Sequence, residues 1–127
     1  MIRIVTRVVL ATAVLALLAP AAFAGGNAAA GKKTYDMLCF TCHGTTGKGD
    51  GPAGAALNPP PRNFTVGAFK FDADGDGTPG SDADLTLIVT NGAGKYGGNP
   101  VMAPWGGALK PQQIQDVIAY IRTLKKK

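Results

Sequence analysis

Both cysteines and the only histidine of this 127-residue chain fall within one short segment, Cys39-Phe40-Thr41-Cys42-His43. One possible disulfide is too few for a disulfide-stapled miniprotein, and a single histidine excludes a catalytic pair of histidines. The length allows about one domain. The 18 glycines and 9 prolines argue against a long helical bundle or coiled coil. These features predict a small, loop-rich domain whose reactive side chains lie at one point.

The spacing Cys-x-x-Cys-His is the attachment sequence of c-type haem. Two thiols add to the two haem vinyl groups and form thioethers, and the next residue projects beneath the ring, where its imidazole binds iron. We predict that Cys39 and Cys42 tether one haem covalently and that His43 is an axial ligand. With few large apolar side chains outside the first 24 residues, a buried cofactor would also complete the core.

Three other interpretations of this motif remain open. A thioredoxin-like redox pair would need a surrounding βαβ pattern, which the sequence lacks. A structural zinc site would need four ligands, and only three candidates are present. A plain disulfide would leave the adjacent histidine unexplained. Haem attachment is the interpretation that uses all three residues.

An electron-carrying haem with one histidine ligand needs a second axial ligand, which can be Met, Lys, Tyr or an open site. Met37 lies close to Cys39, on the same side of the ring as His43, and we expect it to pack in the core. Met102 lies in the Gly- and Pro-rich residues 97–105, here called the Met102 loop, which can cross the far side of the ring. We predict Met102 as the second ligand, with an ordinary loop methionine as the alternative.

The first 24 residues have the pattern of a secretory signal peptide. Arg3 and Arg7 precede an apolar run over 8–19, and Ala22-Phe23-Ala24 forms a small-x-small cleavage site. The run is shorter than the roughly 20 residues that cross a bilayer, and no cysteine follows it for a lipid anchor. We expect a cleaved signal over 1–24, no membrane anchor, and a single domain over 25–127.

Three helices are predicted in the remaining chain. The first covers 27–38, with Asn27 as its cap and with an interior Gly31 that costs about 1 kcal/mol relative to alanine. The second covers about 82–91, and the third begins at Pro111. The third carries one apolar stripe at i, i+3, i+4 and i+7. Without strand alternation, the fold class is all-α, with three to four short helices and long Gly/Pro loops.

These motifs resemble those of the class I c-type cytochromes, the small periplasmic monohaem cytochromes of bacteria. The resemblance covers nearly all of 25–127. Gly31 and Tyr35 precede Cys-x-x-Cys-His, His43-Gly44 is followed by Gly-x-Gly-x-Gly-Pro, and the Met102 loop precedes the last helix. It implies the cytochrome c fold around one haem, with the first and last helices crossing at Gly31 and Tyr120.

The resemblance also implies residues that support the haem. A proline carbonyl is expected to accept the free N–H of His43, which fixes the ring and makes it a stronger donor. Pro52 is the first candidate, and residues 59–61 are near it in sequence. Arg62 and Trp105 are candidate contacts of the haem propionates, with exposed loop residues as the equal alternative.

Residues 72–77 match the first half of an EF-hand calcium loop, with candidate ligands Asp72, Asp74 and Asp76. The twelfth position is Ala83, where that loop requires a bidentate glutamate, although Asp82 and Asp84 flank it. The favoured interpretation is therefore a Gly/Asp turn, with both flanking aspartates at a helix start. A weak or unusual calcium site is the alternative.

The resemblance implies a periplasmic electron-transfer protein that is not an enzyme, with His43 and Met102 as iron ligands. The expected partners are periplasmic redox proteins or membrane respiratory complexes, the expected state is a monomer, and nucleic acid is not expected. One alternative is a haem c subunit of a larger periplasmic dehydrogenase or reductase. Another is a haem ligand sensor or small peroxidase. The lysines at 125–127 predict a solvated helix end, with a steering patch for an acidic partner as the alternative.

Overall fold

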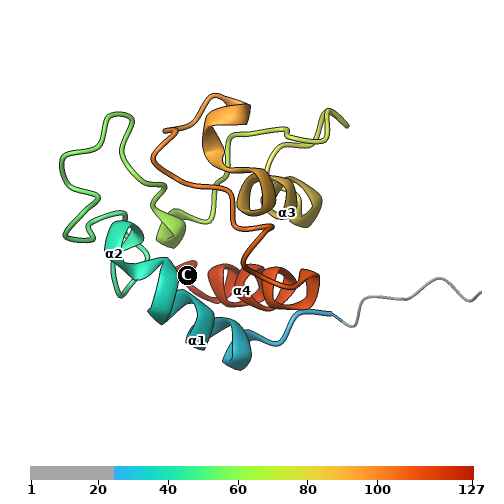
Figure 1. Cartoon of the computed structure of the whole chain (residues 1–127), viewed down its shortest axis with the longest axis horizontal. Helices are drawn as coiled ribbons and strands as arrows, with labels where there is room; N and C mark the ends of the chain where they lie inside the picture. Colours follow the sequence, from blue (N-terminus) through green and yellow to red (C-terminus); the bar gives the residue numbers. More distant parts are fainter. Residues whose placement is uncertain (1–24) are drawn as a thin grey trace, which may run out of the picture.

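The computed structural model describes residues 25–127 and contains six short helical segments, some joined by one residue and others by long loops. The α-helices are α1 (Ala28–Leu38), α2 (Phe40–His43), α3 (Asp82–Asn91) and α4 (Pro111–Thr123), and the 3₁₀ helices are η1 (Phe64–Val66) and η2 (Ala93–Tyr96) (Figure 1). Residues 25–127 contain no β-strand. The all-α prediction is therefore confirmed. The predicted signal over 1–24 lies outside the described residues.

The helix boundaries follow local signals in the sequence. The Asn27 side chain accepts a hydrogen bond from the Ala30 amide and caps α1. A capping box joins Ser81 and Asp84 at the start of α3. Pro111 occupies the first turn of α4, where its missing N–H costs nothing. All three predicted helices are present.

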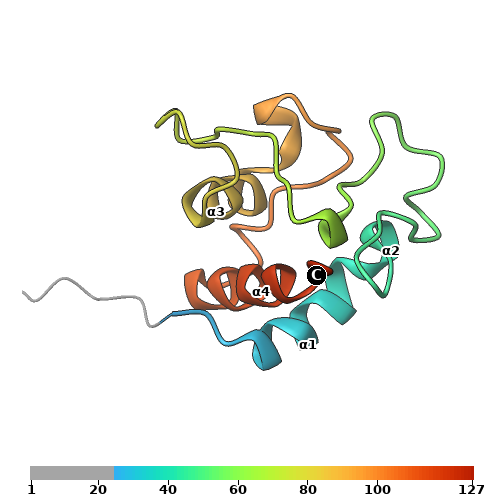
Figure 2. The ribbon, with the colours of Figure 1, turned by 180° about the vertical axis from the view of Figure 1, so that it is seen from behind.

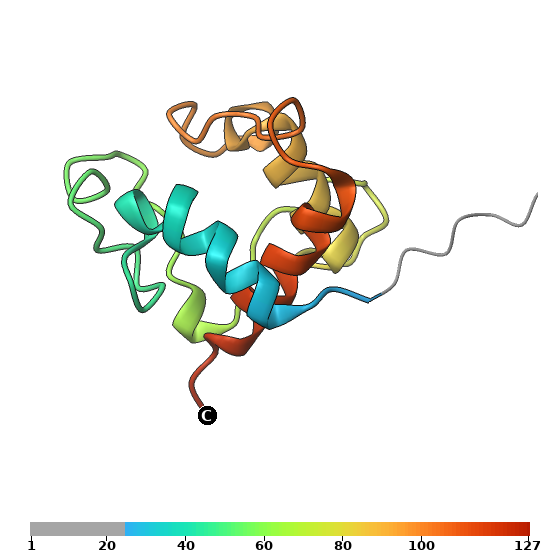
Figure 3. The same cartoon turned by 60° about the horizontal axis from the view of Figure 1, so that its bottom comes forward.

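Helices α1 and α4 cross at a point that only glycine allows (Figure 3). A Cβ atom on Gly31 would lie 1.8 Å from the carbonyl oxygen of Asp116, inside the backbone of α4. The fully buried Tyr35 lies one turn further along α1, and its ring packs edge-on against Tyr120 at 5.1 Å between centroids. The close approach explains why α1 tolerates an interior glycine, as the resemblance implies.

The core has two parts that flank a cavity. One joins α1, η1 and α4 through Tyr35, Phe64, Val117 and Ile121. The other joins α3 and α4 through Leu85, Val89, Ile114 and Ile118. Phe69 packs against both. Seen from behind, the loop after α2 and the turn before α3 lie at opposite ends of the molecule (Figure 2). Among the described residues, no helix is long and apolar enough to cross a membrane.

Candidate haem site

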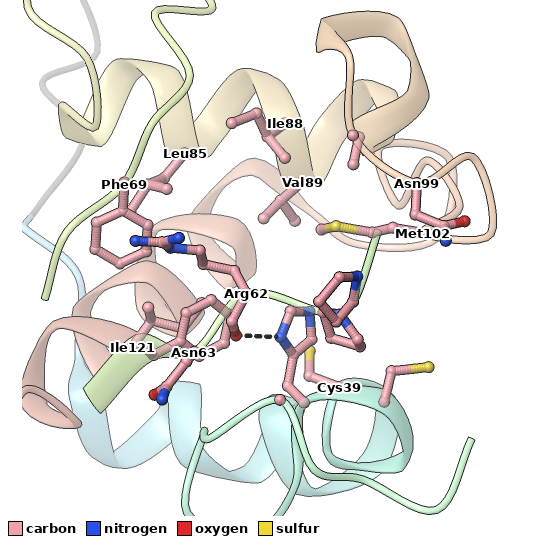
Figure 4. Close-up of a pocket in the computed structure, with 18 of the residues that line it drawn as sticks. Cys39, Arg62, Asn63, Phe69, Leu85, Ile88, Val89, Asn99, Met102 and Ile121 are labelled. Atoms are coloured by element: carbon pink, nitrogen blue, oxygen red, sulfur yellow. Dashed lines mark hydrogen bonds between the residues drawn. The ribbon is translucent and has the colours of Figure 1, made fainter. Parts of the chain in front are cut away.

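A cavity of about 470 Å³ lies between the two parts of the core (Figure 4). Its volume is within the range of about 300–1,000 Å³ that is typical of small-molecule and cofactor sites. Apolar side chains from α3, α4 and the long loops form most of its lining. Six residues predicted from the sequence line it, namely Cys39, Cys42, His43, Arg62, Met102 and Trp105.

His43 is held in a single orientation at the end of α2. Its Nδ1 atom lies 3.1 Å from the carbonyl oxygen of Arg62, and only 9% of the residue is exposed. A carbonyl can only accept, so Nδ1 carries the proton and Nε2 keeps a free lone pair. Burial lowers the pKa of His43, and the hydrogen bond to Arg62 offsets part of that shift. A neutral imidazole with a free Nε2 is the form that binds iron.

The carbonyl partner of His43 was predicted to be Pro52, and that prediction is wrong. Pro52 is exposed and does not line the cavity. The loop after α2 turns back onto that helix, since the Ala53 amide donates to the Thr41 carbonyl at 2.9 Å. After this loop the chain returns to the segment that follows His43, where the Phe64 amide donates to the Gly47 carbonyl at 2.7 Å. Arg62 lies at that point and supplies the carbonyl.

Two aromatic residues fix the surroundings of His43. The Phe64 ring stacks on the imidazole, with centroids 4.4 Å apart and planes 19° apart. The Tyr35 hydroxyl donates to the carbonyl of Gly44 at 2.7 Å, and burial raises the pKa of Tyr35. The stacking of Phe64 was not predicted, because the sequence shows only an apolar residue within a loop. Its placement depends on Asn63, whose side chain caps η1.

Cys39 and Cys42 lie on one side of the cavity, at the start and within the single turn of α2. Residues three apart share a helix face, so both sulfurs can reach the same ring. Burial, together with the neighbouring Cys42, raises the pKa of the Cys39 thiol to about 11. Within residues 25–127, only Asp72, Asp74 and Asp84 cluster as ligands of one metal ion would. The Cys-x-x-Cys-His segment therefore does not have the geometry of a zinc site.

Met102 lies on the opposite wall of the cavity from Cys39 and points into it (Figure 4). Its carbonyl accepts from the Ala93 amide at 3.2 Å, and the Trp105 amide donates to the Val89 carbonyl at 2.9 Å. These bonds attach the Met102 loop to α3 and η2. Met37, by contrast, is 67% exposed, so its predicted core position is wrong. It follows the buried Tyr35 by two residues, which places it on the opposite side of α1.

Arg62 and Trp105 also reach the cavity. The Arg62 Nε atom donates to the Ala68 carbonyl at 2.7 Å, and one of its terminal nitrogens donates to the same oxygen. Trp105 packs against the Leu85 part of the core. The positions of a guanidinium and an indole on the cavity lining remain compatible with contacts to haem propionates, which stay a prediction.

The acidic turn is organised around Asp84, which is fully buried. One of its carboxylate oxygens accepts from the amides of Ala73 and Asp74, and the other accepts from the amide and hydroxyl of Ser81. Burial acts to raise the pKa of Asp84, but these hydrogen bonds lower it to about 2.

Two of the three predicted calcium ligands, Asp72 and Asp74, meet at one point together with Asp84. Carboxylates of Asp72, Asp74 and Asp84 lie within 4.8 Å of one another, whereas Asp76 is outside this group among the described residues. The Asp74 carboxylate accepts from the Asp76 amide two positions on, as in an Asx turn, and the Asp72 carboxylate accepts from the Gly77 amide five positions on. These hydrogen bonds fit the predicted turn with aspartates at a helix start, and calcium binding stays the alternative prediction.

Comparison with known proteins decides the family. The family model for cytochrome c matches residues 28–125. The chain belongs to the cytochrome c family. Haem c, bound covalently, is the cofactor of this family, and electron transport through its iron is the family's role. The cytochrome c fold and the haem predicted from the cysteine motif are thereby confirmed.

Several relatives agree with this assignment. Cytochrome c-554(547) of Halothiobacillus neapolitanus is 34% identical over 102 residues, which cover 79% of this chain and 99% of that one. The cbb3-type cytochrome c oxidase subunit FixP of Azorhizobium caulinodans is 32% identical over 104 residues. That match covers 80% of this chain, which spans only 29% of the longer FixP protein.

Two solved structures have a similar fold. A chain of the Kuenenia stuttgartiensis reducing HAO-like protein complex aligns with a TM-score of 0.61 and 31% identity, covering 76% of this chain and 41% of that one. The KustC0563 c-type cytochrome aligns with a TM-score of 0.51 and 26% identity, covering 76% and 98%.

The side chains around the cavity fit haem c. The apolar lining suits the macrocycle, and two thiols on one helix suit its attachment. The free Nε2 of His43 and the thioether of Met102 are the donor types that hold haem iron in cytochromes. Each donor reaches the cavity from a different part of the chain.

Proposed function

We propose that this cytochrome is a periplasmic electron carrier whose single haem iron is held by His43 and Met102 and cycles between the ferrous and ferric states. The observation that carries the proposal is the position of these two side chains on one apolar cavity, with Met102 on the wall opposite Cys39 (Figure 4). When bound, the haem supplies a one-electron couple that needs no proton. If His43 and Met102 both bind the iron, they would leave it no open position, and the chain would act as a carrier and not as an enzyme.

The protein contributes two different ligands, the fixed imidazole of His43 and the polarisable thioether of Met102. The Arg62 carbonyl holds the proton of His43 on Nδ1, which keeps Nε2 available to the iron in both oxidation states. A neutral thioether favours reduced iron and raises the reduction potential. The surrounding apolar side chains exclude water and so limit the rearrangement that accompanies each electron transfer.

Replacement of Met102 tests the ligation. Met102→Ala is expected to give a high-spin or five-coordinate ferric haem and to lower the potential by about 100 mV or more, within the ~0.8 V range that axial ligands span. The matched control is Met37→Ala, because Met37 is 67% exposed. Visible absorption and a redox titration report both effects. If Met102→Ala keeps the spectrum and potential of the wild type, Met102 is not the ligand.

A second candidate function is a haem c subunit of a larger oxidoreductase. Two of the matched proteins favour it, since this chain spans 29% of FixP and 41% of a chain from the HAO-like complex. Gel filtration of extracts from the native host separates the two functions. A carrier elutes as a monomer of residues 25–127 with its haem, below the 12.9 kDa of the uncleaved chain, and a subunit co-elutes with a much larger redox protein.

Export to the periplasm rests on the charged start and apolar run of residues 1–24. Intact mass spectrometry of the protein from the periplasmic fraction tests it. A chain that begins at Gly25 and carries one haem supports export with cleavage. A chain that retains Met1 in the cytoplasmic fraction contradicts it.

A further inference from the structure

Two loops that come from distant parts of the sequence meet at the cavity. One contains Pro59 and leads to the Arg62 carbonyl that holds His43. The other is the Met102 loop. The Asn99 side chain joins them, because its Nδ2 atom donates to the Pro59 carbonyl at 3.1 Å, across 40 positions of sequence. Figure 4 shows Asn99 and Met102 on the same loop at one edge of the cavity.

Asn99 also shapes the loop that carries the methionine. Its Oδ1 atom accepts from the Val101 amide at 2.9 Å, and its main-chain carbonyl accepts from the Met102 amide at 3.1 Å. The same residue therefore sets the local turn that presents Met102 and attaches that turn to the opposite loop.

Other contacts of the Met102 loop are with η2 and not with the loop that contains Pro59. The Met102 carbonyl and the Gly98 amide both bond to Ala93, at 3.2 and 2.9 Å. A Cβ atom on Gly94 would lie 3.1 Å from Pro100, so this part of the loop packs closely on η2. These contacts hold the loop to η2, whereas the Asn99 amide holds it to the loop on the His43 side.

We propose that Asn99 is a positioning residue that latches the Met102 loop to Pro59 and thereby keeps the Met102 thioether directed at the iron. The inference rests on the proposed ligation by Met102. With the latch formed, the second axial position is closed to outside ligands. With the latch lost, the loop remains attached to Ala93 but opens more often at the cavity edge. Asn99 thus favours an electron carrier over a haem that binds exogenous ligands.

The test is the rate at which imidazole binds to the ferric, haem-loaded protein. At saturating imidazole this rate reports how often Met102 leaves the iron. Asn99→Asp keeps an acceptor for the Val101 amide but removes the N–H that reaches Pro59, and Asn99→Ala removes both. We expect binding about tenfold faster in Asn99→Asp, the change that follows the loss of one net hydrogen bond, and faster still in Asn99→Ala.

The matched control is Asn91→Asp. The Asn91 Nδ2 atom donates to the Tyr96 hydroxyl at 2.8 Å, so this change also removes one amide donor and adds a charge but leaves both cavity loops joined. We expect it to bind imidazole at the rate of the wild type. Hydrogen exchange of the Met102 amide gives a second measurement, and it should accelerate in Asn99→Asp and not in Asn91→Asp.

The test distinguishes a failure of the proposed Met102 ligation from a failure of the Asn99 latch. If the wild type binds imidazole as fast as Met102→Ala, the second axial position is already open, and the proposed ligation and the latch are both wrong. If the wild type is slow and Asn99→Asp is equally slow, with unchanged exchange of the Met102 amide, Met102 ligation stands and the latch is wrong. Equal acceleration by Asn99→Asp and Asn91→Asp would also overturn the latch, since the effect would then be a general loss of stability.

Discussion

The two walls of the haem cavity are built differently. On the His43 side, the ligand is 9% exposed and is stacked on Phe64, which belongs to the same core cluster as the fully buried Tyr35. On the Met102 side, the ligand lies in a loop whose neighbour Val101 is 61% exposed. The first ligand is held by buried core residues, whereas the second is a partly buried side chain that packs against the Leu85 part of the core and is carried by a hydrogen-bonded surface loop.

The difference has a functional meaning. A ligand embedded in the core cannot move without loss of packing, so the His43 side sets a constant frame for the haem. A partly buried ligand on a loop can leave at a lower cost, namely its contacts with one part of the core and a few hydrogen bonds. The stability of the protein should therefore depend on the His43 side, and its spectrum and ligand access on the Met102 side.

The strongest test of this contrast is Gly31→Ala, at the crossing of α1 and α4. Its Cβ would lie 1.8 Å from the Asp116 carbonyl, so the helices that support His43 must separate, at a cost of about 3 kcal/mol or more in the free energy of unfolding. Denaturant unfolding measures this loss of stability. A Cβ on Gly107 would meet nothing within 4 Å, and Gly107→Ala is the control that should unfold like the wild type. Equal stability of both variants would contradict the close crossing.

A smaller effect is expected for Phe64→Leu. Leucine removes the ring that stacks on His43 at 4.4 Å while it keeps an apolar side chain, and we expect a loss of about 1–1.5 kcal/mol in the free energy of unfolding. The orientation of the imidazole plane should change too, and the paramagnetic shifts of the haem methyl protons report it. Val101→Ala, on the exposed Met102 side, should stay within about 0.5 kcal/mol. If Val101→Ala costs as much as Phe64→Leu, the two walls do not differ.

The last prediction concerns the pH dependence of Asp84, whose side chain completes the capping box at the start of α3. Its hydrogen bonds lower the pKa of Asp84 to about 2, from an ordinary value of 3.8. A lowered pKa means that its stabilisation is complete above the ordinary value and is lost as the pH falls through 2. The melting temperature of the wild type should therefore fall between pH 4 and pH 2.

Asp84→Asn should remove this part of the pH dependence, since the amide does not titrate in that range. Asp76→Asn, an exposed change in the same turn, should preserve it. If the melting temperatures of the wild type and of Asp84→Asn fall in parallel from pH 4 to pH 2, Asp84 does not cause this pH dependence.

Features with local causes could be predicted from the sequence. The cap of α1 at Asn27, the Ser81–Asp84 box and Pro111 at the start of α4 all depend on residues a few positions apart. The haem attachment segment is equally local, because its chemistry needs five consecutive residues. The role of Gly31 could be predicted because the resemblance to the c-type cytochromes implies that the first and last helices cross at this residue.

Contacts that depend on where a long loop comes back to the rest of the molecule could not be predicted. The carbonyl partner of His43 is Arg62 and not Pro52, because the loop after α2 first folds back onto its own helix. No local pattern states where such a loop comes back to the histidine. The stacking of Phe64 and the bond between Asn99 and Pro59 have the same origin, since each joins residues far apart in sequence.

The most direct test of the central claim is a spectroscopic redox titration of the haem-loaded wild type at neutral pH, with the reduced protein then exposed to carbon monoxide. A carrier with His43 and Met102 on the iron should show one reversible one-electron transition, low-spin spectra in both states, and no change with carbon monoxide. Prompt carbon monoxide binding, with a high-spin reduced spectrum, would contradict the account and indicate a ligand sensor or peroxidase.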